Sequence, residues 1–392
     1  MALRVKTIAH RNADTAFLAA GRKRLDKLFP KLFEYVEEGP CDVICFLSGG
    51  SEHAAVASLK PGAYVLLLAG FEDNAYAAAM EVMAWAGNRR IPAMLLSMDE
   101  AAKSSFLGDL DLVCGAFRSL EGQRAGLIGE VSHWLVASAV QKDHARDKLG
   151  LDLVHIPWGG LPDYAAFPPD PELLEVFRDH GPETLEKEAG ILSFLKKGIS
   201  DQRLDALTLE CFNMVIEQNV TACLSLGLLN SRGFPAGCEG DLVSLAGMML
   251  AKELTGVVPW MANVAAIREG SILFAHCTVP LNLVENFEVH THFETGKSAA
   301  IQGKTNLDQV TVFRMNDRLD KAFVAEGKIV SRPNHAYACR TQSEVALSPS
   351  DHDKLSRWNN GMPHYPHQQH GHLFQAQAHR SPPEEADTPP YA

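Results

Sequence analysis

Short apolar runs alternate with helical patterns through the first 150 residues, which is typical of a parallel β-sheet covered by helices. Segment 42–47, Asp-Val-Ile-Cys-Phe-Leu, is apolar after its first residue, as expected of a buried strand. We expect strands at 42–47, 63–68, 93–96, 110–114 and 124–128, and a helix at 75–86. Polar loops follow the first two strands, and ligands of open α/β sheets bind at such carboxyl-end loops.

The middle of the chain is helical in pattern. Residues 172–197 are rich in charge, and 201–218 are expected to continue as helix. Segment 233–241 is dense in turn residues and precedes an apolar helix that extends to residue 254. Asp241 suits the N-cap of this helix and Gly256 suits its C-terminal stop. The sequence therefore predicts this helix together with both of its ends.

From about residue 286 the pattern changes to strands at 287–293, 310–314 and 323–330, separated by Gly, Asn and Asp. This spacing predicts a small antiparallel domain. The expected organisation is an N-terminal α/β domain, a second α/β domain that carries the Glu239 loop, an antiparallel β-rich domain and a disordered tail, at 1–155, 156–285, 286–380 and 381–392.

Composition narrows the class of protein. Hydrophobic residues make up 46% and charged residues 21% of the 392 residues, which is the balance of a globular protein. No apolar run is long enough to span a membrane or to form a signal peptide, so a cytoplasmic location is expected. The net charge of −12 argues against a nucleic-acid partner. The eight cysteines include no Cys-x-x-Cys pair, which is typical of reduced cytosolic thiols rather than a zinc ribbon.

Glu239 is the strongest candidate for chemistry. It lies in the loop Cys-Glu-Gly-Asp at 238–241, just ahead of the predicted helix. The positive end of a helix dipole favours an ionised carboxylate, so Glu239 could serve as a metal ligand or a base. Alternatively, Asp241 caps the helix and Glu239 is only a solvated loop residue. Spacing alone favours neither interpretation.

Histidines supply further candidates. His276 follows an apolar run at 272–274, where a hydrogen-bonded core histidine is the commoner outcome and a ligand the rarer one. Glu288, His290, His292 and Glu294 recur with period two, so they would share one face of a strand. A solvated polar face explains most of them, and His292 is the exception that we single out.

Four histidines near the C-terminus, at 364, 367, 370 and 372, give an imidazole density that suits metal binding, although a histidine-rich surface turn is an alternative.

The sequence motifs of other enzyme classes are absent. The chain has no Gly-x-Gly-x-x-Gly after a strand, no Walker loop, no Gly-x-Ser-x-Gly elbow and no His-Glu-x-x-His. A dinucleotide enzyme or a serine hydrolase therefore has no support.

The order of several short motifs resembles the L-fucose isomerase-like family, within the L-fucose/L-arabinose isomerase superfamily. The central motifs are Pro-Ala-Gly-Cys-Glu-Gly-Asp at 235–241, Leu-Thr-Gly at 254–256, Met-Ala-Asn at 261–263 and Ala-His-Cys at 275–277. Flanking segments at 49–52, 74–81, 126–135, 292–296 and 339–342 also fit. The resemblance covers roughly residues 40–345 and is to the shorter members of the family.

The resemblance implies an α/β fold of two Rossmann-like or flavodoxin-like parallel-sheet domains plus a C-terminal antiparallel β domain. It also implies a homo-trimer or homo-hexamer that acts on a small-molecule sugar. The family's chemistry is aldose–ketose isomerisation through a cis-enediol. A divalent cation, usually Mn²⁺, holds the sugar oxygens, and a carboxylate moves the proton between adjacent carbons.

Carried over by position, the resemblance implies a metal site of Glu239, Asn263, His276 and a C-terminal histidine, which is His364 or else His367. Glu239 and Asp241 are the implied catalytic carboxylates, with Glu294 as another acid that could serve. The implied sugar-binding residues are Glu52, Asn74, His292 and Arg340.

Asn263 departs from the family pattern, which has an acidic ligand at that position. A neutral amide keeps an oxygen ligand but loses the charge and the basicity, so metal affinity should fall and one candidate base is absent. The alternative to an isomerase is therefore a non-catalytic sugar-binding or regulatory protein on the same scaffold.

Overall fold

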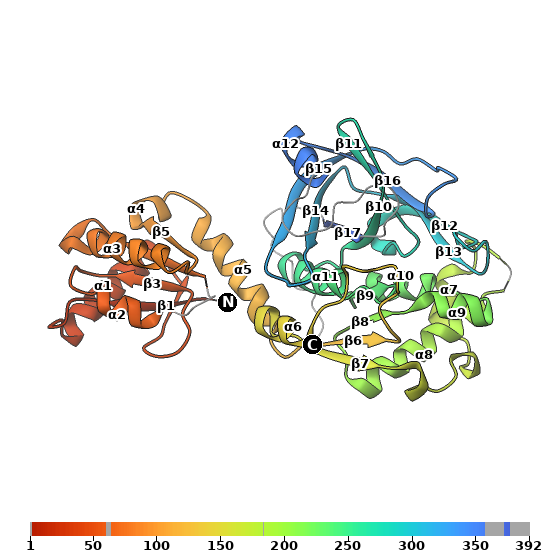
Figure 1. The fold of residues 1–392 in the computed structure, drawn as a ribbon, viewed down its shortest axis with the longest axis horizontal. Coiled ribbons are helices and arrows are strands. Elements are labelled where there is room, and N and C mark those ends of the chain that lie inside the picture. The colour runs from red at the N-terminus through yellow and green to blue at the C-terminus, as the bar shows by residue number, and fades with distance from the viewer. Residues whose placement is uncertain (1, 60–63, 183, 357–371, 377–392) are drawn as a thin grey trace, which may run out of the picture. The chain divides into compact units, whose positions relative to one another are not determined.

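The computed structural model describes residues 2–59, 64–182 and 184–356, and the backbone of 372–376. The chain divides into two compact units, Met1–Arg118 and Ser119–Ala392. Each unit is built around a parallel sheet, and the second unit also carries antiparallel strands (Figure 1). The predicted fold class, two parallel-sheet α/β parts with an antiparallel β part, is confirmed.

The first unit has a parallel sheet in the order β2-β1-β3-β4-β5, the order of a flavodoxin-like fold. Alternate residues of β3 and β4 face two separate cores, because successive side chains of a strand point to opposite faces. The strands are β1 Leu3–Ile8, β2 Phe33–Tyr35, β3 Val43–Phe46, β4 Val65–Ala69 and β5 Ala93–Ser97. The helices are α1 Thr15–Leu28, α2 Glu52–Ser58, η1 Glu72–Asn74, α3 Ala75–Asn88, α4 Met98–Ala101 and α5 Phe106–Leu120.

The strand predicted at 110–114 is wrong, because these residues lie inside helix α5. Leu107, Leu110 and Cys114 recur at spacings of three and four, and all three pack on one core of the first sheet. The other predicted strands of this region, at 42–47, 63–68 and 93–96, are confirmed as β3, β4 and β5, and the predicted helix at 75–86 is confirmed as α3.

The second unit has a parallel sheet in the order β7-β6-β8-β9. Strand β6, predicted at 124–128, pairs with β8 and so belongs to this sheet. The strands are β6 Arg124–Ile128, β7 Asp152–Ile156, β8 Ala206–Leu209 and β9 Ala236–Cys238. The helical segments are α6 Lys142–Leu149, η2 Trp158–Gly160, η3 Tyr164–Ala166, α7 Pro171–Phe177, α8 Glu186–Gln202, α9 Cys211–Gln218, α10 Cys223–Ser231 and α11 Leu242–Thr255.

The helical prediction for the middle of the chain is correct only in part. Segment 172–197 falls in two helices, α7 and α8, rather than one. Segment 201–218 contains strand β8 before helix α9, because the fully buried run Ala206–Leu209 completes the sheet. The ends of α11 are confirmed: the Asp241 side chain caps its start, and Gly256 ends it in a left-handed conformation.

The antiparallel strands form a closed barrel in the order β10-β11-β16-β15-β14-β17, beside a two-stranded β12-β13 hairpin. Strands predicted at 310–314 and 323–330 are confirmed as β14 and β15, but the barrel already begins with β10. The strand predicted at 287–293 is correct only for 287–290, which belong to β12, because the chain turns after His290. The strands are β10 Trp260–Arg268, β11 Ser271–His276, β12 Val284–His290, β13 Ala300–Thr305, β14 Gln309–Met315, β15 Ala322–Ser331, β16 Thr341–Leu347 and β17 His372–Ala376. The helical segments are η4 Leu281–Leu283 and α12 Pro349–Ser356.

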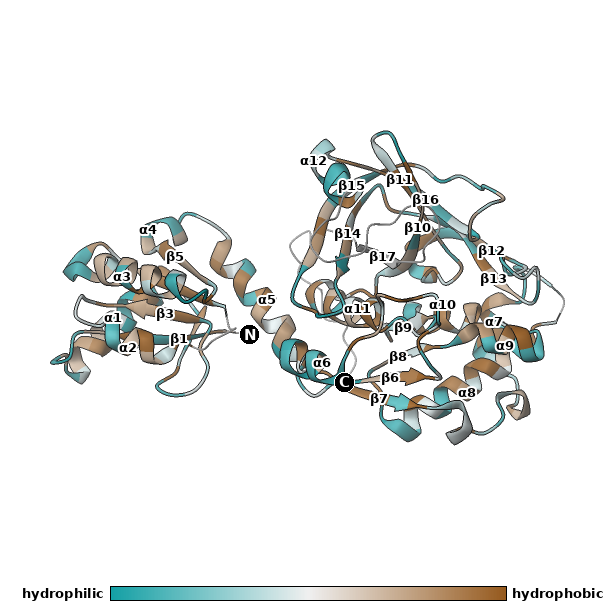
Figure 2. Ribbon diagram, in the orientation of Figure 1, coloured by the Kyte–Doolittle hydropathy of each residue, from teal (hydrophilic) through white to brown (hydrophobic). Residues whose placement is uncertain are grey.

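Hydropathy along the ribbon follows burial. Central strands such as β3 and β6 are hydrophobic, whereas the short helix α6 is hydrophilic (Figure 2). In the part of the chain that the structure describes, every helix is too short or too polar to cross a lipid bilayer.

Candidate active site

Loops after three neighbouring strands meet at the carboxyl edge of the second parallel sheet. β6 pairs with β8, and β8 pairs with β9, so the loops that begin at Gly129, Glu210 and Glu239 lie next to one another. Gly240 has a φ of 70°, and a Cβ placed on it would lie 2.9 Å from the Cα of Val131. Only glycine fits such a close approach of two loops. The sequence Glu-Gly thus brings Glu239 against the loop after β6.

Glu239 lies directly after β9 in a left-handed backbone conformation, with a φ of 61°, which is uncommon for residues other than glycine. Its Oε2 accepts a hydrogen bond of 2.7 Å from the indole N–H of Trp134. Its carbonyl oxygen accepts a hydrogen bond of 3.0 Å from the backbone N–H of Ser132. The residue is 4% exposed. Glu239 is therefore not a solvated loop residue, and such backbone outliers occur often at functional sites.

Aromatic rings line up beside this carboxylate. Trp134 and Phe212 are in edge contact with ring centroids 4.9 Å apart, and Phe212 contacts the His292 ring at 5.6 Å. Phe212 comes from the start of α9 and His292 from the turn after β12. The three rings connect the loop after β6 with the antiparallel part of the chain, and they form one wall of the site.

His292 is held on both ring nitrogens. Nδ1 lies 3.0 Å from Thr295 Oγ1, and Nε2 lies 3.4 Å from Glu294 Oε2. Burial lowers the pKa of His292, and the nearby guanidinium of Arg340 lowers it further. As the sequence pattern indicated, Glu288 is solvent-exposed and His290 is half-buried, whereas His292 is buried. His292 is therefore a neutral, oriented imidazole at neutral pH.

Glu294 is a carboxyl group that takes up a proton easily. Its side chain is 26% exposed. Partial burial, and then the negative charge of Glu239, raise the pKa of Glu294 to about 7. A carboxyl with such a pKa is present in both protonation states near neutral pH. Glu239 and Glu294 thus form a pair of interacting acidic groups in one site.

Cysteine thiols pack behind the acidic pair. Cys211 Sγ and Cys238 Sγ are 3.1 Å apart, where α9 begins and β9 ends. The thiols of Cys223 and Cys339 donate hydrogen bonds to Cys277, which lowers the pKa of Cys277 and raises theirs. All five cysteines are free, and all but the partly exposed Cys339 are buried, so they act as soft packing in this region.

Asp241, the second predicted catalytic carboxylate, has structural contacts on both oxygens. Oδ1 accepts from the Ser244 N–H at 2.7 Å, and Oδ2 accepts from the Ser244 hydroxyl at 2.7 Å. Arg314 of the barrel forms an ion pair with Oδ2 at 3.3 Å, and Asp241 is fully buried. These contacts fix the start of α11 and tie it to strand β14.

Asn263 and His276 lie on neighbouring barrel strands. Asn263 pairs with Ala275, so strand alternation places Asn263 and His276 on opposite faces of the barrel wall. Met261, on the same face as Asn263, accepts a hydrogen bond on its sulfur from the N–H of Cys238 at 3.4 Å. The Asn263 face is thus the one that borders the Glu239 loop. His276 Nδ1 lies 2.9 Å from Thr278 Oγ1.

Two predicted sugar-binding residues, Glu52 and Asn74, lie in the first unit. They line one cavity of about 690 Å³ at the carboxyl edge of that sheet, together with His10 and the glycine loop 48–50. Asn74 has a left-handed backbone and begins α3. The structure therefore brings Glu52 and Asn74 together in one cavity of the first unit.

Arg340 is anchored beside His292. Its Nε donates to the Thr291 carbonyl oxygen at 2.6 Å, and its Nη2 donates to the Thr291 hydroxyl at 3.0 Å. This places one fixed positive charge close enough to His292 to lower its pKa.

The residues present suit a hard divalent cation. Asn263 Oδ1 is buried and has no hydrogen-bond partner among the described residues, and carboxylate and amide oxygens are the ligands that Mn²⁺ prefers. Within the described ranges no three His, Cys, Asp or Glu side chains are grouped to hold a metal. Of the predicted metal ligands, only Glu239 and His276 are His, Cys, Asp or Glu residues that the structure describes. His364 and His367 lie outside the described residues. The ligand set stays a prediction.

Sequence reasoning missed the aromatic wall. Trp134 lies in segment 126–135, which is part of the family resemblance. Nothing in the sequence indicated that its indole would donate a hydrogen bond to Glu239. Phe212 had no signal, because its segment looked like the continuation of a helix.

The fold and site together define an α/β protein with a buried carboxylate centre at the carboxyl edge of a parallel sheet. The chain is similar to two curated proteins named sulfoquinovose isomerase, from Priestia aryabhattai and Priestia megaterium. Each is 22% identical over 260 residues, 61% of this chain and 58% of the relative's length. No family model matches the chain. A likeness at this identity and coverage does not show the family of this chain, and the L-fucose isomerase-like assignment stays a prediction.

Proposed function

We propose that this protein is a sugar isomerase that interconverts an aldose and a ketose through a cis-enediol. The observation that carries the proposal is the acidic pair, a buried Glu239 that interacts with the protonatable Glu294. The reaction needs one group that removes a proton from carbon and returns it to the next carbon. The likeness to sulfoquinovose isomerases is independent support.

Glu294 is the residue that would move this proton. A general base is most effective when its pKa is close to the working pH, and the pKa of Glu294 is about 7. His292, hydrogen-bonded at Nδ1 and in contact with Glu294 through Nε2, would orient the carboxyl group. Asp241 is less suited to this step, because both of its oxygens are engaged in contacts within the fold.

Glu239 would bind rather than transfer the proton. The Trp134 indole N–H holds its carboxylate at 2.7 Å, and the fixed backbone keeps it aimed into the site. The guanidinium of Arg340 would pair with a negatively charged group on the sugar, such as the sulfonate of a sulfonated sugar. The substrate class that we propose is therefore a small sugar, with a sulfonated sugar as the first to test.

A divalent cation such as Mn²⁺ would be held by Glu239 and Asn263, and when bound it would stabilise negative charge on the sugar oxygens. His276 lies on the opposite face of the barrel wall from Asn263 and would not join them, and His364 lies outside the described residues. The described donors suit it because Asn263 Oδ1 is a buried oxygen without a partner in the described ranges.

A proton-exchange assay tests the proposal. Aldoses and ketoses, including sulfoquinovose, are incubated with the protein and Mn²⁺ in deuterated water, and exchange at the carbon next to the carbonyl is followed by NMR. An isomerase exchanges that hydrogen and forms the partner sugar. Glu239→Gln should abolish turnover with the fold intact, whereas Glu326→Gln, on the exposed side of β15, should not.

Two outcomes would contradict the proposal. Undiminished turnover by Glu239→Gln would remove Glu239 from the active site. Sugar binding without exchange for any sugar, in protein loaded with Mn²⁺, would support the alternative of a non-catalytic sugar-binding or regulatory protein.

A further inference from the structure

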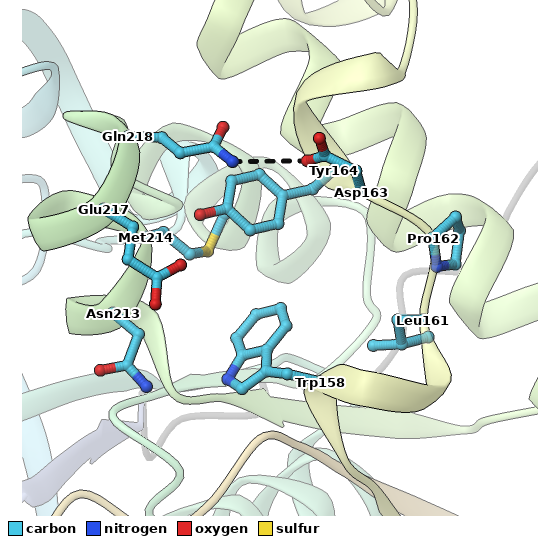
Figure 3. Close-up of a pocket in the computed structure, with 9 residues that line it drawn as sticks. All are labelled: Trp158, Leu161, Pro162, Asp163, Tyr164, Asn213, Met214, Glu217 and Gln218. Atoms are coloured by element: carbon cyan, nitrogen blue, oxygen red, sulfur yellow. Dashed lines mark hydrogen bonds between the residues drawn. The ribbon is translucent and has the colours of Figure 1, made fainter.

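A second cavity lies on the other side of helix α9 from the aromatic wall. It has a volume of about 240 Å³ and opens between α9 and the loop after β7 (Figure 3). Phe212 of α9 faces Trp134 and His292, whereas residues further along the same helix line this cavity. The lining residues are Trp158, Leu161, Pro162, Asp163, Tyr164, Asn213, Met214, Glu217 and Gln218.

The two aromatic rings of the cavity are held in place. The indole N–H of Trp158 donates to Glu210 Oε2 at 3.0 Å. Phe194 stacks on Trp158 at a centroid distance of 6.3 Å and meets Tyr164 edge-on at 5.9 Å. Because these rings are fixed by their surroundings, a ligand would not have to order them, which lowers the free energy lost on binding.

The polar lining is acidic. Asp163 and Glu217 supply two carboxylates, and no Lys, Arg or His is among the lining residues. Asn213 and Gln218 add amides, and Gln218 donates to Asp163 at 3.4 Å. A cavity with two negative charges and two aromatic faces attracts a cation, since the face of an aromatic ring carries partial negative charge.

Tyr164 provides an independent indication of a ligand. The residue is 8% exposed, and its hydroxyl has no hydrogen-bond partner in the part of the chain that the structure describes. Figure 3 shows that this hydroxyl points towards Glu217 and Met214. Burial, and then the charges of Glu217 and Asp163, raise the pKa of Tyr164 to about 12, so it stays neutral. A buried hydroxyl usually has a partner, and the hydroxyl of a bound amino alcohol could pair with this one.

We propose that the cavity between α9 and the loop after β7 binds a small organic ammonium ion. The cation would contact the faces of Trp158 and Tyr164, with Glu217 and Asp163 balancing its charge. The site does not depend on the acidic pair of Glu239 and Glu294.

Choline and its neutral isostere 3,3-dimethylbutan-1-ol test the proposal by titration calorimetry on the full chain. The two probes have the same shape, so a difference in affinity reports the charge. Choline should bind with a Kd of about 1 mM or lower, and at least about tenfold more tightly than the alcohol. Glu217→Gln should weaken choline binding by about threefold or more and leave the fold intact, because Glu217 is exposed.

Glu326→Gln is the matched control, since it removes the same charge from an exposed strand position and should leave choline binding unchanged. Equal affinity for choline and the alcohol would overturn the proposal. An equal loss of choline affinity in Glu217→Gln and Glu326→Gln would also overturn it. Tighter binding of glucose than of choline, with no effect of Glu217→Gln, would identify a polyol site instead. Absence of choline binding up to 50 mM, which is roughly fifty times the expected Kd, would also overturn it.

Discussion

Two carboxyl groups, those of Glu239 and Glu294, interact at the centre of the site. The sequence makes Glu239 a candidate because a glycine and a helix start flank it, which is a local signal. Its burial and its contact with Trp134 depend on strand order, which brings the loops after β6 and β9 to one edge. Glu239 follows the parallel sheet and Glu294 follows the antiparallel strand β12, so no local sequence pattern indicates that the two carboxyl groups interact.

Glu294 gives a pH-dependent prediction. The pKa of this group is near 4.5 in an unfolded chain and about 7 in the folded protein. The folded state therefore binds more protons between these values, and the stability that the protonated group contributes is full below pH 4.5 and lost as the pH rises through 7. The shift corresponds to about 3 kcal/mol at most, and we expect 1 to 2 kcal/mol, roughly, because water partly screens the side chain.

Glu294→Gln removes this ionisation. The variant should be more stable than the parent protein at pH 8 and closely similar at pH 4.5, while turnover falls sharply. Urea unfolding at the two pH values measures the difference in the free energy of unfolding. An equal difference at both pH values would show that Glu294 does not titrate in this range.

Asn263 tests the metal ligand set. Asn263→Asp places a carboxylate where a buried amide oxygen has no partner in the described ranges. An added anionic oxygen beside a dication should tighten Mn²⁺ binding by about tenfold or more. Titration calorimetry gives the affinity, with Asn286→Asp at an exposed position of β12 as the control. Unchanged affinity would mean that residue 263 does not face the metal.

At the scale of elements, sequence patterns predicted seven strands in whole or in part, namely β3, β4, β5, β6, β12, β14 and β15, and misjudged two segments. Residues 110–114 are apolar enough for a strand, and only the packing of α5 on the first sheet distinguishes the helix. Residues 206–209 form a short buried run that periodicity alone does not separate from helix. Both segments were decided by tertiary packing, whereas α11 was predicted correctly because Asp241 and Gly256 mark its ends chemically.

Asp241 connects α11 to the barrel, so its removal should affect stability first. Asp241→Ala loses the N-cap and leaves the buried Arg314 without its carboxylate. We expect a loss of about 3 to 5 kcal/mol in the free energy of unfolding. Asp241→Asn, which keeps a capping oxygen, should lose less. Unchanged stability of Asp241→Ala with abolished turnover would instead favour the catalytic role predicted from the sequence.

Gly240 positions the Glu239 loop, and Gly256 offers a matched comparison. Both have positive φ, 70° and 76°. A Cβ at Gly240 would clash with the backbone of residues 130–131, whereas a Cβ at Gly256 would have no atom within 4 Å among the described residues. Gly256→Ala should cost about 1 kcal/mol, from the backbone conformation alone. Gly240→Ala should cost more and also reduce turnover, because the loop must move. Chemical unfolding and the exchange assay measure the two effects.

At the scale of the molecule, the chain consists of two compact units with separate hydrophobic cores. Leu67 lies in a core of the first unit, and Leu207 lies in the core of the second. The division after Arg118 falls within α5, where the sequence carries no linker composition, so it had no sequence signal. The homo-trimer or homo-hexamer implied by the resemblance stays a prediction, which sedimentation velocity would test.

Separate cores lead us to expect two thermal transitions in differential scanning calorimetry, because a unit with its own core can unfold on its own. Leu67→Ala creates a cavity in the first unit and should destabilise that unit by about 2 to 5 kcal/mol, lowering one transition. Gly240→Ala should lower only the other transition. A single transition that both variants shift to the same extent would contradict the prediction, because it would mean that the two sheets unfold as one cooperative unit.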